Sequence, residues 1–289
     1  MKLKSNHIGL VIAIMLACLF DVKRLWAAQP PRTIADAFLD EELTYAIGFW
    51  VFDDVAIGKV TFKRADDGDY VATLEAYTTG VVDWVLRNRR DTYRVHMRMS
   101  ADGKRFISKT FEKSIEMGGK TRRGLTVFDY EKRLMTWRSW GGGKDERSGV
   151  EKLPPNIHID DPITAFYNFR YGVYGPPVEG REYTIYSFPK GDETPHIYLR
   201  VATRPELEAR RGVNLSADYL AFARIDKDLF GSQSGDVEVL FTSEMLPNEA
   251  VARDILFFGD VRGRLVKIGV GMDFKTTAAP PAPRISAPR

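Results

Sequence analysis

The sequence has very little cysteine and almost no net charge. Cys18 is the single cysteine among 289 residues, so no disulfide bond can form within the chain, and its hydrophobic core must stabilise it. Lys and Arg number 42 against 39 Asp and Glu, and residues 1–28 carry this whole excess of three. The remaining residues are formally neutral, which argues against binding to nucleic acid or another polyanion through bulk charge.

The sequence also lacks a catalytic or metal-binding motif. None of its four histidines is paired at the short spacing typical of a zinc site: His7, His96, His158 and His196. His158 lies close to Asp160 and Asp161, and a carboxylate can orient a histidine for base catalysis. Asp161 is explained more simply as the N-cap of a helix. We therefore predict no metal, no cofactor and no enzymatic activity.

No apolar run is long enough to cross a membrane as a helix. The first run, residues 8–20, has thirteen uncharged residues, whereas a membrane-spanning helix needs roughly 20. Lys2 and Lys4 precede it, which is typical of a secretory signal. We predict an export signal over residues 1–28 and a location in the periplasm or outer envelope. Met15-Leu16-Ala17-Cys18 leaves a lipid anchor on Cys18 open as an alternative.

Most of the remaining chain alternates with the period of a β-strand. The clearest case is Thr92–Ser100, where Tyr93, Val95, Met97 and Met99 alternate with polar and basic residues. Tight turns rich in glycine and aspartate separate such segments, and tight turns join antiparallel neighbours. The pattern predicts a mainly β protein, with a long antiparallel meander that forms a curved sheet or half-barrel.

Two helices interrupt this pattern. Thr33–Glu42 begins with a capping residue and has one apolar side, which predicts a short N-terminal helix. Asp161 as N-cap, Pro162 at the first helical position and Gly172 as C-cap predict a central helix that is rich in aromatic residues. The stretch Pro205–Leu215 is expected to be a longer connection.

The composition of the chain suggests three parts. We predict the export signal at residues 1–28, a single β-rich domain at 29–272, and a disordered tail at 273–289. The tail is predicted from its many proline and alanine residues, which cannot form a packed core.

One segment of the β-rich domain is densely basic. Between residues 87 and 98 it carries arginines that suit phosphates, acidic lipid headgroups or an acidic partner: Arg87, Arg89, Arg90, Arg94 and Arg98. The alternative is an ordinary solvated strand face, on which the arginines pair across strands with Glu112 or Glu116.

Three segments resemble the bacterial envelope family known as domain of unknown function 3108. Residues 42–45 and 56–60 resemble its opening, and residues 161–170 resemble its central aspartate–serine–alanine–aromatic–tyrosine–arginine signature, with Thr164 in place of serine. Residues 239–244 resemble its late strand, with Glu244 in place of aspartate. The resemblance implies export and a β-rich fold, and it implies no activity and no catalytic residue.

Two functions follow as expectations. The first is a non-enzymatic envelope protein that binds a lipid or another apolar or amphiphilic ligand on the concave face of its sheet. Its candidate ligand-binding residues are Tyr93, Met97, Met99, Phe166 and Arg170. The alternative is a module that docks another envelope protein through four arginines of the basic segment: Arg87, Arg90, Arg94 and Arg98.

Overall fold

The computed structural model describes residues 33–49, 52–188, 196–211, 217–227, 231–256 and 258–269. These residues belong to one compact unit that begins at Thr33. The predicted export signal, including Cys18, and the predicted proline-rich tail lie outside the described residues.

The described residues form one antiparallel sheet of fourteen strands. Its first half consists of β1 (Glu42–Phe49), β2 (Phe52–Arg64), β3 (Tyr70–Thr78), β4 (Arg90–Met99), β5 (Phe106–Met117), β6 (Lys120–Asp129), β7 (Leu134–Gly141) and β8 (Lys144–Lys152). The second half consists of β9 (Glu182–Tyr186), β10 (His196–Val201), β11 (Tyr219–Arg224), β12 (Asp236–Phe241), β13 (Pro247–Ile255) and β14 (Gly259–Ile268).

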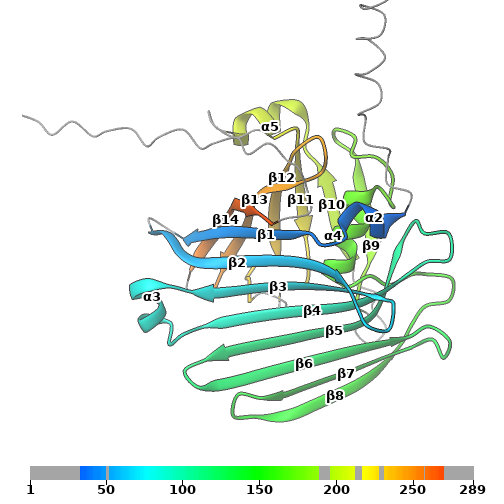
Figure 1. The fold of residues 1–289 in the computed structure, drawn as a ribbon, viewed down its shortest axis with the longest axis horizontal. Coiled ribbons are helices and arrows are strands. Elements are labelled where there is room, and N and C mark those ends of the chain that lie inside the picture. The colour runs from blue at the N-terminus through cyan, green and yellow to red at the C-terminus, as the bar shows by residue number, and fades with distance from the viewer. Residues whose placement is uncertain are drawn as a thin grey trace, which may run out of the picture. The chain divides into compact units, whose positions relative to one another are not determined.

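The order of the strands explains the shape of the sheet. Within β1 to β8, and within β9 to β14, each strand pairs with its neighbour in sequence, and β1 also pairs with β14, which joins the two halves. The sheet ends at β8 and β9, which do not pair with each other in the described part of the chain, so the barrel stays open. The predicted curved antiparallel meander is therefore confirmed (Figure 1).

The alternation predicted for the clearest strand is also confirmed. In β4 the side chains of Tyr93, Val95 and Met97 are buried, while those of Arg94 and Arg98 are exposed. The apolar side chains point to the interior because successive side chains of a strand point to opposite faces of the sheet. The strand at β8 was not predicted, since Lys144–Lys152 is almost entirely exposed and shows no apolar alternation.

Four helices accompany the sheet in the described residues: α2 (Ile34–Phe38), α3 (Gly80–Val85), α4 (Pro162–Tyr171) and α5 (Arg204–Arg211). The predicted N-terminal and central helices correspond to α2 and α4. Thr33 caps α2 with a capping box, and Asp161 and Gly172 cap α4 as predicted. The predicted longer connection at Pro205–Leu215 lies between β10 and β11, and α5, which was not predicted, occupies its first part. The charged residues of α5 form helical pairs such as Arg204–Glu208, at 2.9 Å, instead of an apolar stripe.

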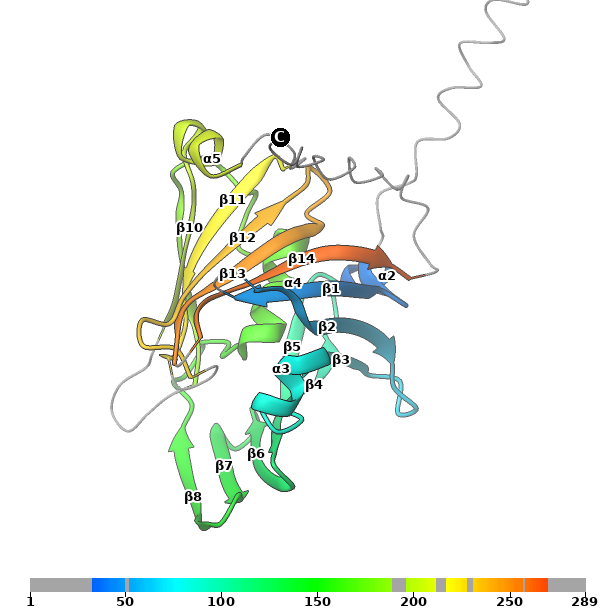
Figure 2. The ribbon, with the colours of Figure 1, turned by 90° about the vertical axis from the view of Figure 1, so that its left-hand side faces the viewer.

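Helix α4 lies on the inner side of the curved sheet and packs against both halves (Figure 2). The ring of Tyr167 lies 5.0 Å from that of Phe62 in β2, and the ring of Phe169 lies 5.6 Å from that of Tyr183 in β9. The aromatic residues of this helix therefore fill the centre of the fold. The aromatic side chains of α4 do not cover the remaining part of the inner face of β5–β8.

Candidate functional site

The inner face of β5–β8 combines apolar and cationic side chains in an ordered way. Directly paired residues of antiparallel strands lie on the same face, so the strand register identifies each row of inward side chains. One row contains Phe111, Thr126, Trp137 and Gly149. The next row, two residues along each strand, contains Lys113, Gly124, Ser139 and Arg147.

The rows on either side show that the polarity of the inner face changes along the strands. Phe128, Met135 and Glu151 form the row on the apolar side, while Ile115, Arg122 and Gly141 form the row at the far end of the strands. Apolar side chains therefore predominate toward the core. The cations Lys113, Arg122 and Arg147 gather toward the ends of the strands.

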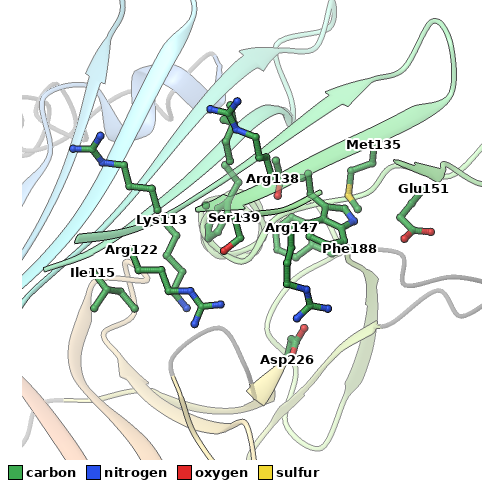
Figure 3. Close-up of a pocket in the computed structure, with 16 residues that line it drawn as sticks. Lys113, Ile115, Arg122, Met135, Arg138, Ser139, Arg147, Glu151, Phe188 and Asp226 are labelled. Carbon is green, nitrogen blue, oxygen red and sulfur yellow. The ribbon is translucent and has the colours of Figure 1, made fainter. Parts of the chain in front are cut away.

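A cavity of about 690 Å³ lies over these rows. Its lining also includes Phe188 and Asp226, which come from the other half of the sheet. Figure 3 shows the side chain of Arg147 directed toward Asp226 across the cavity. The volume lies within the range of roughly 300–1,000 Å³ that is usual for small-molecule sites.

Two glycines help to make the cavity. A Cβ atom at Gly149 would lie 2.6 Å from Nε1 of Trp137, so the indole lies flat against the backbone of β8. A Cβ atom at Gly124 would meet only the carbonyl oxygen of Arg138 at 3.8 Å and Cβ of Lys113 at 3.9 Å. Gly124 therefore leaves open space in the middle of the lining, where a larger residue would fit against the backbone without strain.

Two guanidinium groups that line the cavity, those of Arg122 and Arg147, have no ion-pair partner among the described residues. Lys113 lies with Nζ 5.6 Å from the ring centroid of Tyr93. Burial lowers the pKa of Lys113, and the positive charge of Arg122 lowers it further. An acidic group bound beside Lys113 and Arg122 would offset the repulsion between these two cations.

Four of the five predicted ligand-binding residues lie mainly in the packed core. Met97 is fully buried, and Met99 and Phe166 pack against the core at partial exposure. Tyr93 is buried against Phe111 and lines a second, smaller cavity of about 190 Å³. None of the four lines the larger cavity, and a role for them in ligand binding stays a prediction.

The fifth predicted residue, Arg170, forms a buried ion pair. Its Nη1 and Nη2 donate to the two carboxylate oxygens of Glu41 at 2.7 and 2.6 Å, and its Nε donates to the carbonyl oxygen of Met245 at 2.9 Å. The hydroxyl of Tyr167 donates to the same carboxylate at 3.1 Å. The structure thus gives Arg170 the role of partner to a buried carboxylate.

The four predicted docking arginines are all exposed. Arg94 and Arg98 lie on the outer face of β4, while Arg87 and Arg90 lie near the start of that strand. The register places Arg94 opposite Glu112 and Arg90 opposite Glu116, while the ion pair that Arg90 forms is with Glu75 of β3 at 2.9 Å. Partner binding by these arginines stays a prediction.

The cluster of His158, Asp160 and Asp161 is not assembled as a catalytic pair. His158 has no hydrogen bond to either carboxylate within the described residues. Asp160 accepts from Arg105 and from the hydroxyl of Tyr174, both at 2.5 Å.

Asp161 is the buried N-cap of α4 and accepts from the hydroxyl of Ser108 at 2.6 Å and from the backbone N–H groups of Ile163 and Thr164. Burial raises its pKa to about 6, against the opposing effect of these hydrogen bonds.

One group of potential metal ligands occurs in the described part of the chain. It consists of Asp67, Asp69 and His96 at the β2–β3 turn and on β4. The ammonium of Lys109 already lies 2.5 Å from Oδ2 of Asp69. The carboxylates therefore have a cation of their own, and the prediction of no metal is left as it stands.

Sequence reasoning did not select Lys113, Arg122 or Arg147. The residues carry no motif, and they lie on three different strands of the meander. The available signal was glycine inside strand segments, at Gly124 and Gly149, since such glycines often mark sites where another group approaches closely.

Comparison with known proteins gives a family and a distant structural similarity. The family described as "Protein of unknown function (DUF3108)" matches residues 43–245, which confirms the resemblance seen in the sequence. No curated protein matches the chain. A crystal structure of a beta-barrel-like protein of domain of unknown function DUF1849 from Brucella abortus is 11% identical, with a TM-score of 0.46. The similarity covers 81% of this chain and 99% of that one. In the described residues, no helix is both long and apolar enough to cross a membrane.

Proposed function

Since the chain belongs to the family of unknown function DUF3108, no activity comes with its fold, and we propose that it is a non-enzymatic protein that binds an amphiphile with an acidic head group. The polarity gradient across the cavity carries this proposal. Phe111, Met135 and Trp137 offer an apolar surface for a hydrocarbon chain. Arg122 and Arg147 offer guanidinium groups to a carboxylate or phosphate at the other end.

The packing of the interior supports this location for the ligand. The space around α4 is filled by its own aromatic side chains, whereas the space over Gly124 is open. The proposal therefore keeps the concave sheet face expected from the sequence. It places the ligand on β5–β8 rather than on the residues of β4 and α4.

The proposal includes the compartment expected from the sequence. An export signal over residues 1–28 would deliver the protein to the periplasm or outer envelope, where acidic amphiphiles are present as membrane lipids and their products. Docking of another envelope protein through Arg94 and Arg98 is the alternative. The outer face of β4 presents both arginines to solvent, and this exposure fits an ordinary solvated surface as well as a docking site.

The experiment is a binding titration with two fluorescent probes of equal chain length, a fatty acid and the corresponding fatty alcohol. We expect the wild type to bind the acid at least tenfold more tightly than the alcohol. Arg122→Gln with Arg147→Gln should remove this preference and leave the weaker binding of the alcohol unchanged.

The variant Gly124→Leu should fill the cavity and abolish binding of both probes. Its matched control is Gly263→Leu, the same exchange in β14, which is not part of the cavity lining. Thermal unfolding would establish that both variants are folded. If Gly124→Leu bound the acid as tightly as the wild type does, the cavity would not be the site and the proposal would be wrong.

A further inference from the structure

One end of the sheet carries exposed apolar side chains on two neighbouring connections. Helix α3, between β3 and β4, exposes Trp84 to 83% and Val85 to 63%. The β5–β6 turn exposes Met117 to 48%. Figure 1 shows α3 extending beyond the ends of the strands. Tryptophan is usually buried over most of its surface, so exposure of this extent at a projecting helix is unusual.

The two connections form one surface, which we call the α3 rim: Trp84, Val85, Arg87, Met117 and Lys120. The backbone N–H of Gly118 donates to the carbonyl oxygen of Arg87 at 2.8 Å, which ties the β5–β6 turn to the segment after α3. The two connections therefore lie next to each other at the same end of the sheet.

The charges of the α3 rim are positive and available. Arg87 and Lys120 are exposed and form no ion pair with any described residue. Two nearby acidic residues, Asp83 and Glu75, have partners of their own. Asp83 accepts from the hydroxyl of Thr78 at 2.5 Å, and Glu75 pairs with Arg90 at 2.9 Å. Glu116, beside Met117, is exposed and is the acidic residue that the cations of the rim outnumber.

We propose that the α3 rim docks the protein on the surface of a bilayer that contains anionic lipid. Trp84, Val85 and Met117 would enter the interfacial region, where tryptophan is favoured. Arg87 and Lys120 would lie against lipid phosphates, because a basic residue near an anionic membrane surface contributes to binding. The combination of projecting apolar side chains and flanking cations matches the chemistry of such a surface.

A protein partner fits this surface less well. A stable protein interface buries roughly 800 Å² on each side, with apolar residues that fit into a pocket of the partner. The α3 rim offers three apolar side chains at a projecting tip, which is a small area for a protein but sufficient for shallow insertion into a headgroup layer.

The docking proposal does not depend on ligand binding, although the two would work together. Arg122, at the cationic end of the cavity, and its register partner Ile115 flank the same β5–β6 turn that carries Met117. A docked α3 rim would therefore bring the cationic end of the cavity toward the lipid from which an amphiphile would come.

The test is flotation of the full-length chain with vesicles of phosphatidylcholine and phosphatidylglycerol in a 3:1 ratio, and with vesicles of phosphatidylcholine alone. We expect binding to the anionic vesicles that weakens at high salt. Trp84→Ser should lower the partition coefficient at least tenfold. Arg87→Gln and Lys120→Gln should each lower it about fivefold on anionic vesicles only.

Matched controls come from exposed residues away from the α3 rim. Tyr198→Ser removes an aromatic residue that is 55% exposed on β10, and Arg98→Gln removes an exposed arginine at the other end of β4. Both should bind as the wild type does. All variants share residues 1–32, so any contribution of that segment cancels in the comparison.

Two results would overturn the docking proposal: no binding of the wild type to anionic vesicles, or equal binding of Trp84→Ser and the wild type. The variant Gly124→Leu separates the two proposals, since it should lose the fatty acid and keep vesicle binding.

Discussion

Arg170 and Arg122 are both directed to the inner side of the sheet, yet their surroundings are opposite. The side chain of Arg170 is 2% exposed and all three of its donor nitrogens are bonded, two of them to Glu41. Arg122 lines an open cavity and has no ion pair with a described residue. Burying a guanidinium without hydrogen-bond partners would lower the stability of the fold by several kcal/mol. Each donor nitrogen of Arg170 therefore has an acceptor in the protein, whereas the side chain of Arg122 stays hydrated.

This difference separates structural charges from candidate binding charges. The central family signature runs from Asp161 to Arg170, and at its two ends it supplies a helix cap and a buried ion pair. Both the helix cap and the ion pair are formed with groups of the protein itself. Arg122 and Arg147 form no ion pair with a described residue, which makes them the better candidates for contact with a ligand.

The largest effect is expected from Arg170→Met. The variant leaves the carboxylate of Glu41 buried without its cation, which should lower the free energy of unfolding by about 3–5 kcal/mol. The matched variant Arg122→Met should change it by less than about 0.5 kcal/mol, since that side chain is exposed. Urea denaturation of both proteins provides the measurement.

A double variant tests the cause of this loss. Glu41→Leu with Arg170→Met removes both charges, so it should be clearly more stable than Arg170→Met alone. Equal loss in the single and double variants would show that packing of Arg170 against Phe38 and Tyr167, rather than its charge, is what matters.

A smaller loss is expected from Asp161→Ala. The variant removes the cap of α4 and leaves the buried hydroxyl of Ser108 without its acceptor, which together should cost about 2 kcal/mol. Thr33→Ala removes the cap of α2, whose hydrogen bonds are exposed, and should cost about 1 kcal/mol or less. Thermal unfolding can rank the two. An equal loss in both would mean that burial adds nothing to the cap of α4.

Much of this fold could be predicted because its signals are local. The alternation in β4 and the cap residues of α4 each lie within a dozen residues of sequence, and the structure confirms them. Helix α3 and strand β8 were missed because their residues are mostly partly or fully exposed, so no apolar periodicity marks them. Tertiary pairing determines such elements more than their own composition does.

The candidate site could not be predicted in the same way, because strand register assembles it. Lys113, Arg122 and Arg147 are separated by up to 34 positions and meet only when β5 to β8 are aligned. The sequence directed attention to Met97 and Phe166, whose apolar character fits a ligand site and a core equally well. The ion pair of Arg170 with Glu41 could not be predicted either, because the two residues are far apart in the sequence and meet only in the folded core.

The smallest effect is expected from the titration of Lys113. Its folded pKa lies below the ordinary lysine value near 10.4, because burial disfavours its charged form. An acidic ligand binds better to the charged form, so affinity should be complete at neutral pH. It should fall as pH rises through the lowered pKa of Lys113, by about fivefold in total. A fatty acid stays ionised over this range, and so the ligand itself does not titrate.

The groups around Lys113 allow this titration to be identified. The hydrogen bonds from Arg89 to Asp91 raise the pKa of Arg89, and burial raises the pKa of Tyr93 so that its hydroxyl remains neutral. Lys113→Arg should therefore bind the fatty acid with an affinity that does not change between pH 7 and 10, because arginine keeps its charge. Lys113→Gln should bind about fivefold more weakly at every pH. If the wild type and Lys113→Arg showed the same decline with pH, Lys113 would not contact the acidic group, and Arg122 and Arg147 would have to bind it alone.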